Sequence, residues 1–386
     1  MFHPRGNLPG HFKPEIADDA GRGKRDVDLL CSLRLLRYNS PTMAEEEKSL
    51  PREDAGTPPP ADRRAGFSKG RTKLSIEPYK GVRDFYPEDM AVQNYIFSTW
   101  KKVCEEFGYQ EYAASLLEPA ELYRSKGSDE IVNEQMFTFI DRGEREVALR
   151  PEMTPSLARM VAAKRRSLKF PLRWYSIPNC FRYERPQRGR KREHWQLNAD
   201  VMGIAGVEAE VEIISLAHAI MKSFGAKDTD FQIKIGSRGA LTEALAKKGV
   251  PAEHHKTIAR LIDRKGKMPD EERATELARL GGEVVITETS HMIALRKQLS
   301  EIGVTNTEFD AEIVRGFDYY TGMVFEVFDT NPENRRSLFG GGRYDNLLEM
   351  FGVDPVPTVG FGMGDVTIRD FLETHKLPLS TNLRMD

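Results

Sequence analysis

The sequence has few cysteines, no long apolar run and almost no net charge. Its three cysteines, Cys31, Cys104 and Cys180, lie far apart and have neither a metal-like spacing nor an even count for pairing, so we interpret them as thiols in a reducing compartment. No apolar run approaches the roughly 20 residues that a bilayer span requires, which predicts a cytoplasmic protein without a membrane partner. Because the formal net charge is only −2, any contact with nucleic acid must use a local basic cluster.

The chain is long enough for two or three domains, and its apolar content is sufficient for a core. It has 386 residues, of which 39% are hydrophobic and 30% charged. Residues 1–77 form an exception, since they are rich in proline, glycine and charge and show no periodic pattern. Such a segment cannot bury enough apolar surface to offset its chain entropy, so we predict a disordered N-terminal extension.

The most distinctive stretch is the basic run at residues 181–196, FRYERPQRGRKREHWQ. Strand-like sequences flank it at 172–177 and 195–204, and Pro186 and Gly189 favour a turn between them. These features predict an antiparallel hairpin with a long basic loop. Guanidinium groups match phosphate oxygens bidentately, so the loop suits a polyanion. The alternative is a solvated basic loop that binds nothing.

Further helices and strands follow from periodicity. Apolar residues at helical spacing predict helices at 88–107, 208–224, 252–264, 270–279 and 344–350. Strand-like runs occupy 109–117, 137–140, 146–150, 231–235, 309–314 and 323–328. Three consecutive glycines at 340–342 would let the backbone approach a ligand closely, or they could form a flexible connector.

Several segments resemble one known family. The FRYE sequence at 181–184, with Arg192, Glu193 and Gln196, resembles motif 2 of class II aminoacyl-tRNA synthetases in its histidyl form. Residues 314–322, VRGFDYYTG, resemble a histidine-binding signature of histidyl-tRNA synthetases, and residues 339–345, FGGGRYD, resemble their second signature. The similarity extends from about Tyr79 to His375.

The resemblance implies an α+β fold of the class II synthetase type, with an antiparallel sheet flanked by helices and a helical insertion. The expected division is catalytic core at 78–235, helical insertion at 236–306, catalytic core again at 307–376, and a short tail at 377–386. Residues 118–119 resemble the motif 1 proline of the dimer interface, which implies a homodimer. The family usually continues with an anticodon-binding domain, so the resemblance implies a catalytic core without that domain.

The activity implied by the resemblance is that of a histidine–tRNA ligase. ATP and L-histidine would give histidyl-adenylate and pyrophosphate, and the histidyl group would then pass to tRNA(His). Arg182 and Arg315 would act as catalytic residues that neutralise the α-phosphate from opposite sides. The expected ATP contacts are Arg182, Glu184, Arg315 and Arg343. Mg²⁺ would accompany the ATP phosphates, and the sequence shows no dedicated protein site for a metal.

The histidine substrate would contact two further groups of residues. Glu152, Met153 and Thr154 precede a predicted helix, where a fixed carboxylate suits an ammonium group. The alternative is that Thr154 caps the helix and Glu152 is solvated. Gln196 and Asp200 lie four apart on a strand and share one face, and the resemblance adds Tyr319 and Tyr320 to the imidazole pocket.

The remaining expectations concern tRNA, the nucleotide and rival functions. Arg188, Arg190, Lys191 and Arg192 would contact tRNA phosphates. Residues 357–370 resemble motif 3, but Thr367 stands where its arginine is expected, and Arg369 lies on another helix face. Either the segment is re-registered or the nucleotide is held differently.

Two rival functions are a regulatory subunit of ATP phosphoribosyltransferase in histidine biosynthesis, which shares this core without charging tRNA, and a nucleic-acid-binding module without chemistry.

Overall fold

The computed structural model describes residues 74–125, 131–265, 268–282, 284–314, 319–334 and 336–380. All of the described residues belong to one compact unit, which spans residues 73–386. The expected disordered extension at 1–77 therefore lies almost entirely outside the described residues.

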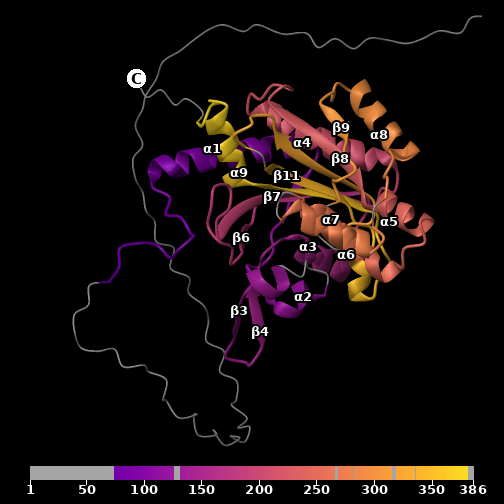
Figure 1. Ribbon diagram of the computed structural model, residues 1–386. Coiled ribbons are helices and arrows are strands. Elements are labelled where there is room, and N and C mark those ends of the chain that lie inside the picture. Colours follow the sequence, from indigo (N-terminus) through magenta and orange to yellow (C-terminus); the bar gives the residue numbers. More distant parts are fainter. Residues whose placement is uncertain are drawn as a thin grey trace, which may run out of the picture. The chain divides into compact units, whose positions relative to one another are not determined.

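A mixed sheet forms the centre of this unit (Figure 1). The strands run in the order β1 (Gln110–Glu111), β5 (Leu172–Ser176), β7 (Glu193–Met202), β12 (Thr358–Gly364), β11 (Ser337–Arg343), β10 (Met323–Asp329), β8 (Phe231–Ser237) and β9 (Thr307–Phe309), and β6 (Asn179–Phe181) also pairs with β7. Only the outermost pairs, β1 with β5 and β8 with β9, are parallel among the described strands. The predicted sheet is confirmed with antiparallel pairing everywhere except at these two edges, and the hairpin around the basic loop is confirmed.

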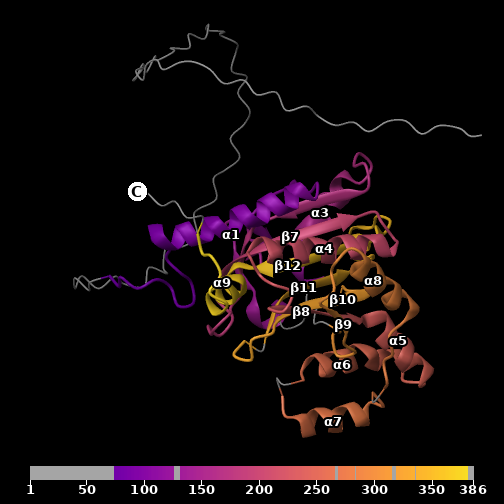
Figure 2. The same ribbon diagram turned by 90° about the horizontal axis from the view of Figure 1, so that it is seen from above.

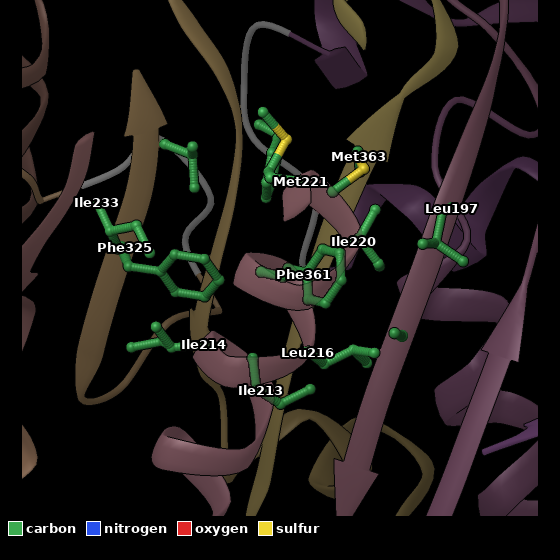
Figure 3. Close-up of a cluster of buried hydrophobic side chains, with 14 of the residues drawn as sticks. Leu197, Ile213, Ile214, Leu216, Ile220, Met221, Ile233, Phe325, Phe361 and Met363 are labelled. Carbon is green, nitrogen blue, oxygen red and sulfur yellow. The ribbon is translucent and has the colours of Figure 1, made fainter. Parts of the chain in front are cut away.

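Helices α1 (Pro87–Glu106), α4 (Val207–Ser223), α8 (Ser290–Glu301) and α9 (Asp365–Thr374) cover one face of the sheet (Figure 2). Helix α1 begins with Pro87, carries Glu88 and Asp89 in its first turn, and is followed by Gly108 at a positive φ of 80°, as start and stop signals predict. Figure 3 shows side chains of α4 packed beside Phe325 and Phe361 of the strands. Burial of this apolar layer leaves the opposite face of the sheet for other contacts.

The opposite face carries a smaller apolar cluster. It involves α3 (Thr154–Lys164) and the 3₁₀ turn η2 (Leu347–Phe351), together with Tyr319, Tyr320 and Tyr344. A second, three-stranded sheet has the order β2 (Leu117–Pro119), β4 (Glu146–Leu149) and β3 (Phe137–Ile140), and α2 (Ala120–Arg124) and the π-helical turn η1 (Ile131–Gln135) lie close to it in sequence.

The region expected to be a helical insertion contains four helices among its described residues. Helices α5 (Arg238–Lys247), α6 (Ala252–Asp263) and α7 (Asp270–Arg279) share an apolar cluster of their own, which includes Leu245, Ile258 and Leu277. Helix α8 also falls in the range 236–306, but its Met292, Leu295 and Leu299 belong to the main core beside α4. None of the helices in the described ranges has both the length and the hydropathy that crossing a membrane requires.

Three expected elements differ from the structure. The strand expected at 109–117 is reduced to β1. Of the strand expected at 309–314 only Phe309 is in a strand, as the last residue of β9. The strand ends there because the Asp310 carboxylate accepts a hydrogen bond from the Glu312 backbone N–H at 2.9 Å and starts a turn. The helix expected at 344–350 is the short turn η2. The glycines at 340–342 are not a flexible connector, because they lie within β11.

Candidate active site

A pocket of about 90 Å³ lies on the face of the main sheet opposite to α4. Strand alternation explains this position, because Leu197 and Ala199 of β7 point into the core, whereas Gln196, Asn198 and Asp200 point the other way. We call it the central pocket. Its lining consists of Glu152, Thr154, Arg182, Gln196, Asn198, Asp200, Tyr319, Tyr320, Gly340, Tyr344, Gly360, Phe361 and Gly362.

Glycines of β12 make room for the polar side chains of β7. Gly360 lies opposite Asp200 in the strand register, and Gly362 lies opposite Asn198. A Cβ atom added to Gly360 would lie 1.9 Å from Asp200 Oδ1, and one added to Gly362 would lie 2.3 Å from Gln196 Nε2. Only glycine therefore fits at these two positions while the β7 side chains keep their orientation.

Glu152 supplies a buried carboxylate at one side of the central pocket. The residue is 2% exposed, and its Oε2 accepts a hydrogen bond from the Tyr319 hydroxyl at 3.1 Å. Its Oε1 is buried and has no hydrogen-bond partner among the described residues. Burial raises the pKa of Glu152 to about 7, although the nearby charge of Arg182 and the Tyr319 hydrogen bond oppose this rise. A bound cation would satisfy the unpaired oxygen and favour the charged form.

Thr154 is the first residue of α3 and lines the central pocket beside Glu152. The cap position is Met153, and no side chain caps the helix start. The alternative in which Thr154 caps the helix is therefore not what the structure contains. Met153 itself is fully buried and does not line the pocket, so its expected contact with histidine stays a prediction.

Asp200 supplies a second buried carboxylate. It is 3% exposed and accepts a hydrogen bond from the Tyr344 hydroxyl. Burial raises the pKa of Asp200 to about 7, and the Tyr344 hydrogen bond partly offsets that effect. The pKa of the Tyr344 hydroxyl is itself raised well above its ordinary value, chiefly by burial and by the charge of Asp200. Tyr344 therefore acts as a donor at working pH.

Three tyrosine rings form an aromatic wall of the central pocket. The ring centroids of Tyr319 and Tyr320 are 5.0 Å apart, and Tyr344 lies 5.4 Å from Tyr319 and 6.2 Å from Tyr320. Aromatic faces of this kind suit a planar ring, and their hydroxyls provide polar contacts.

Arg182 contributes the positive charge of the site. It lines the central pocket, and its Nε donates to the Pro151 carbonyl oxygen at 2.9 Å, which fixes the guanidinium there. His194 lies further along the same face of β7. Burial first, and then the charges of Arg182 and Arg83, lower the pKa of His194 to about 3, so its ring stays neutral. This end of the site is suited to an anionic group.

The comparisons with known proteins bear on the whole arrangement. The family model of histidyl-tRNA synthetase matches residues 81–267 and 233–365. The histidine–tRNA ligase of Leptospira biflexa is 44% identical over 332 residues, which cover 79% of this chain and 76% of that protein. The chain belongs to the histidyl-tRNA synthetase family.

Two further comparisons agree. The chloroplastic/mitochondrial histidine–tRNA ligase of Arabidopsis thaliana is 41% identical over 330 residues, or 79% of this chain and 68% of that protein. A solved structure from Bacillus halodurans, described as an ATP phosphoribosyltransferase regulatory subunit/histidyl-tRNA synthetase, superposes with a TM-score of 0.64. It covers 78% of this chain and 84% of that chain at 24% identity, which supports the shared fold only.

The arginines in the family-like motifs do not all line the central pocket. Arg315 lies outside the described residues. Arg343, expected to contact ATP, faces away from the central pocket because it alternates with Gly342 along β11. Its Nε donates to Glu210 Oε1 at 2.7 Å and its Nη2 donates to the Gly206 carbonyl oxygen at 2.9 Å. The structure therefore makes Arg343 a buried structural residue.

The basic loop also contains a structural arginine. Arg192 is 8% exposed, and its guanidinium stacks on Tyr183 at 3.8 Å and donates to the Tyr79 hydroxyl at 2.9 Å. Arg192 therefore supports the base of the loop in the protein without tRNA, and its expected contact with tRNA stays a prediction.

The other members of the loop lie nearer to solvent. Arg188 pairs with Asp370 of α9 at 2.8 Å, and Arg190 pairs with Glu184 at 3.2 Å; both arginines are exposed. Lys191 is half-buried. Glu184, expected to contact ATP, does not line the central pocket, because its carboxylate faces Arg190.

The motif 3-like segment has the expected strand and helix, β12 and α9, but no arginine of α9 lines the central pocket. Thr367 donates from its hydroxyl to the Leu338 carbonyl oxygen at 2.7 Å. Arg369 pairs with Asp89 at 3.1 Å and with Glu373 at 2.9 Å. Neither residue lines the central pocket, so both explanations of the missing motif 3 arginine remain predictions.

Two polar residues of the central pocket were not predicted. Asn198 lies between Gln196 and Asp200 on the same strand face, so the alternation that paired those two would have included it. Tyr344 belongs to the second family signature, but the resemblance alone did not predict a substrate contact for it. Among the described residues, no group of three or more histidine, cysteine, aspartate or glutamate side chains could hold a metal ion.

Proposed function

We propose that the protein is a histidine–tRNA ligase, which activates L-histidine with ATP and transfers the histidyl group to tRNA(His). The central pocket carries this proposal. It combines two buried carboxylates, Glu152 and Asp200, with an aromatic wall. Histidine offers an ammonium group and a planar ring with N–H donors, so its polar groups match these acceptors.

The substrate orientation follows from charge. The ammonium group would bind the unpaired Oε1 of Glu152 beside Thr154, and the ring would lie against Tyr319 and Tyr320 with an N–H directed at Asp200. The α-carboxylate would then face Arg182, the positive group that lines the pocket. Gln196 would support the amino-group end.

In the first step, a carboxylate oxygen of histidine attacks the α-phosphorus of ATP. A new carbon–oxygen–phosphorus linkage forms, and the bond between the α-phosphorus and the bridging oxygen breaks to release pyrophosphate. Positioning and charge neutralisation supply most of the catalysis in such a step. Arg182 would neutralise the α-phosphate from one side, and by family resemblance Arg315 would do so from the other. Glu184 remains a proposed contact of the adenine, and Mg²⁺ would arrive with the phosphates as part of the substrate.

In the second step, a terminal ribose hydroxyl of tRNA(His) attacks the carbonyl carbon of the adenylate, and AMP leaves. Arg188, Arg190 and Lys191 of the basic loop would contact tRNA phosphates, since the two arginines are exposed. We propose a cytoplasmic location on the basis of the three widely spaced cysteines.

A homodimer is proposed through the region around Pro119. The small sheet that contains this residue presents exposed apolar side chains, namely Leu117 at 45%, Phe139 at 47% and Ile140 at 63% exposure. Apolar side chains gathered on one short sheet are typical of a protein interface.

Aminoacylation of tRNA(His) with labelled histidine tests the proposal against the regulatory-subunit alternative. We expect charging that depends on ATP and histidine, and an Arg182→Ala variant should lose roughly 10²–10³ in rate because a charge contact in the transition state is removed. Arg369→Ala is a matched control, since it removes an arginine held by Asp89 and Glu373, and it should charge normally. A protein that charges no tRNA but stimulates an ATP phosphoribosyltransferase would contradict the proposal.

A further inference from the structure

Tyr112 carries a buried hydroxyl that the proposed substrate contacts leave unused. The residue follows β1, and its backbone N–H donates to the Tyr175 carbonyl oxygen at 2.8 Å. The hydroxyl oxygen is buried and has no hydrogen-bond partner among the described residues. A buried hydroxyl without a partner costs free energy, so such a group is worth explaining.

The strand register places Tyr112 on the same face of the sheet as Asp200, one residue pair further along. Gln110 pairs with Trp174 and Trp174 pairs with Asp200, and side chains of paired residues point to the same face. Tyr112, two residues after Gln110, shares this face and packs on Trp174 with ring centroids 5.7 Å apart. Asp200 therefore has Gly360 on its β12 side and the Trp174–Tyr112 pair on its β5 side.

Electrostatics supports the same neighbourhood. Burial, followed by the charge of Asp200, raises the pKa of Tyr112 well above its ordinary value. Tyr112 also contributes to the raised pKa of Tyr344, the residue that donates to Asp200. Two tyrosine hydroxyls thus lie near one carboxylate, and only that of Tyr344 is bonded to it among the described residues.

We propose that Tyr112 is a positioning residue for the ring-binding part of the central pocket, and that its hydroxyl donates to Asp200 once the amino acid is bound. This inference rests on the proposed function and extends it. With a second donor the carboxylate is favoured in its charged form, which is the form that accepts an N–H of the substrate ring. Tyr112 touches no substrate itself and acts through Asp200.

The test uses a Tyr112→Phe variant of the full chain, which removes one oxygen atom and keeps the ring on Trp174. We expect the Kd for L-histidine, measured by calorimetry without ATP, to rise roughly 10- to 100-fold, as for loss of a hydrogen bond to a charged group. L-histidinol, which keeps the amino group and the ring, should lose affinity by the same factor. The KM for ATP and kcat at saturating histidine should stay within about twofold of the parent.

Stability separates this role from a structural one. Because the hydroxyl lacks a partner in the free protein, Tyr112→Phe should leave the thermal midpoint unchanged or raise it. Tyr175→Phe is the matched control on the opposite face, where the Tyr175 hydroxyl donates to Glu105 at 3.1 Å. That variant should lower the midpoint and leave histidine affinity unchanged.

Each other outcome has a distinct meaning. If the parent protein binds no histidine, the proposed function fails whatever Tyr112 does. If the parent binds histidine and Tyr112→Phe binds it as tightly, this inference alone is overturned. A thermal midpoint well below that of the parent would show that the hydroxyl is already bonded in the free protein, and this too would overturn the inference.

Discussion

Replacement of Glu152 by glutamine should weaken substrate binding while it stabilises the free protein. The side chain is 2% exposed, and its Oε1 has no hydrogen-bond partner among the described residues. Glutamine keeps the shape and the acceptor for Tyr319 but removes the charge. An uncompensated buried ammonium group costs about 3–5 kcal/mol, so the Kd for histidine should rise at least a hundredfold.

The effect on stability has the opposite sign. Burial raises the pKa of Glu152 from its ordinary value of 4.5 to about 7. Below pH 4.5 the carboxyl is protonated in both the folded and the unfolded protein and has no net effect. Between pH 4.5 and 7 the unfolded chain loses this proton first, so the parent loses stability as pH rises. Above pH 7 the loss is complete and is about 3 kcal/mol, because one pKa unit corresponds to about 1.4 kcal/mol.

Urea unfolding at pH 4 and pH 8, combined with calorimetric titration of histidine, measures both effects. The Glu152→Gln variant should match the parent at pH 4 and exceed its free energy of unfolding by about 3 kcal/mol at pH 8. Glu118→Gln is the control, since Glu118 is also buried, at 5% exposure, but pairs with Arg159 at 2.6 Å outside the pocket. It should lose stability and keep histidine affinity. Parent-like histidine binding by Glu152→Gln, or reduced stability at pH 8, would refute the reasoning.

Three further predictions concern the pocket and the basic loop. Gly360→Ala should raise the KM for histidine about tenfold or more, because the added Cβ would lie 1.9 Å from Asp200 Oδ1. The control Gly239→Ala, whose added Cβ has its nearest contact at 3.6 Å, should leave the KM unchanged. Equal KM values for the two variants would contradict the role of Gly360. The Kd for histidine, corrected for the titration of the ligand's own ring, should fall as pH rises from 6 to 8. The reason is that the pKa values of Asp200 and Glu152 are raised to about 7, so both carboxyls become charged over this range. A Kd that does not change with pH would contradict this prediction. Arg192→Ala should lower the free energy of unfolding by about 1–3 kcal/mol, since it removes a stacked and hydrogen-bonded guanidinium; unfolding like that of the parent would show that this contact is unimportant.

The parts of the site that follow from short-range pattern were predictable from the sequence. Gln196 and Asp200 share a face because side chains alternate along any strand, and the structure confirms that both line the pocket. The hairpin around the basic loop follows from two apolar strands and the turn residues between them.

Other features depend on contacts between distant segments, which no local pattern contains. Arg343 and Arg192 look like ligand-binding arginines in sequence, yet each is buried by a partner far along the chain, Glu210 and Tyr79 respectively. The glycines of β11 look like a flexible loop, because only the neighbouring strand β12 reveals that a Cβ at Gly341 would lie 2.0 Å from the Gly360 carbonyl oxygen. The position of Tyr112 on the same sheet face as Asp200 follows only from the register of β1, β5 and β7.

The central claim is that the pocket activates histidine, and histidine-dependent exchange of labelled pyrophosphate into ATP tests it most directly. The purified parent protein should catalyse exchange with L-histidine and with none of the other nineteen amino acids. Histidine offers an ammonium group for Glu152 and a ring N–H for Asp200, and tryptophan, the other amino acid with an aromatic ring N–H, has a much larger ring than a pocket of about 90 Å³ suits. The same preparation of Glu152→Gln should exchange only at much higher histidine concentrations. Absence of exchange with histidine, or equal exchange with another amino acid, would contradict the account.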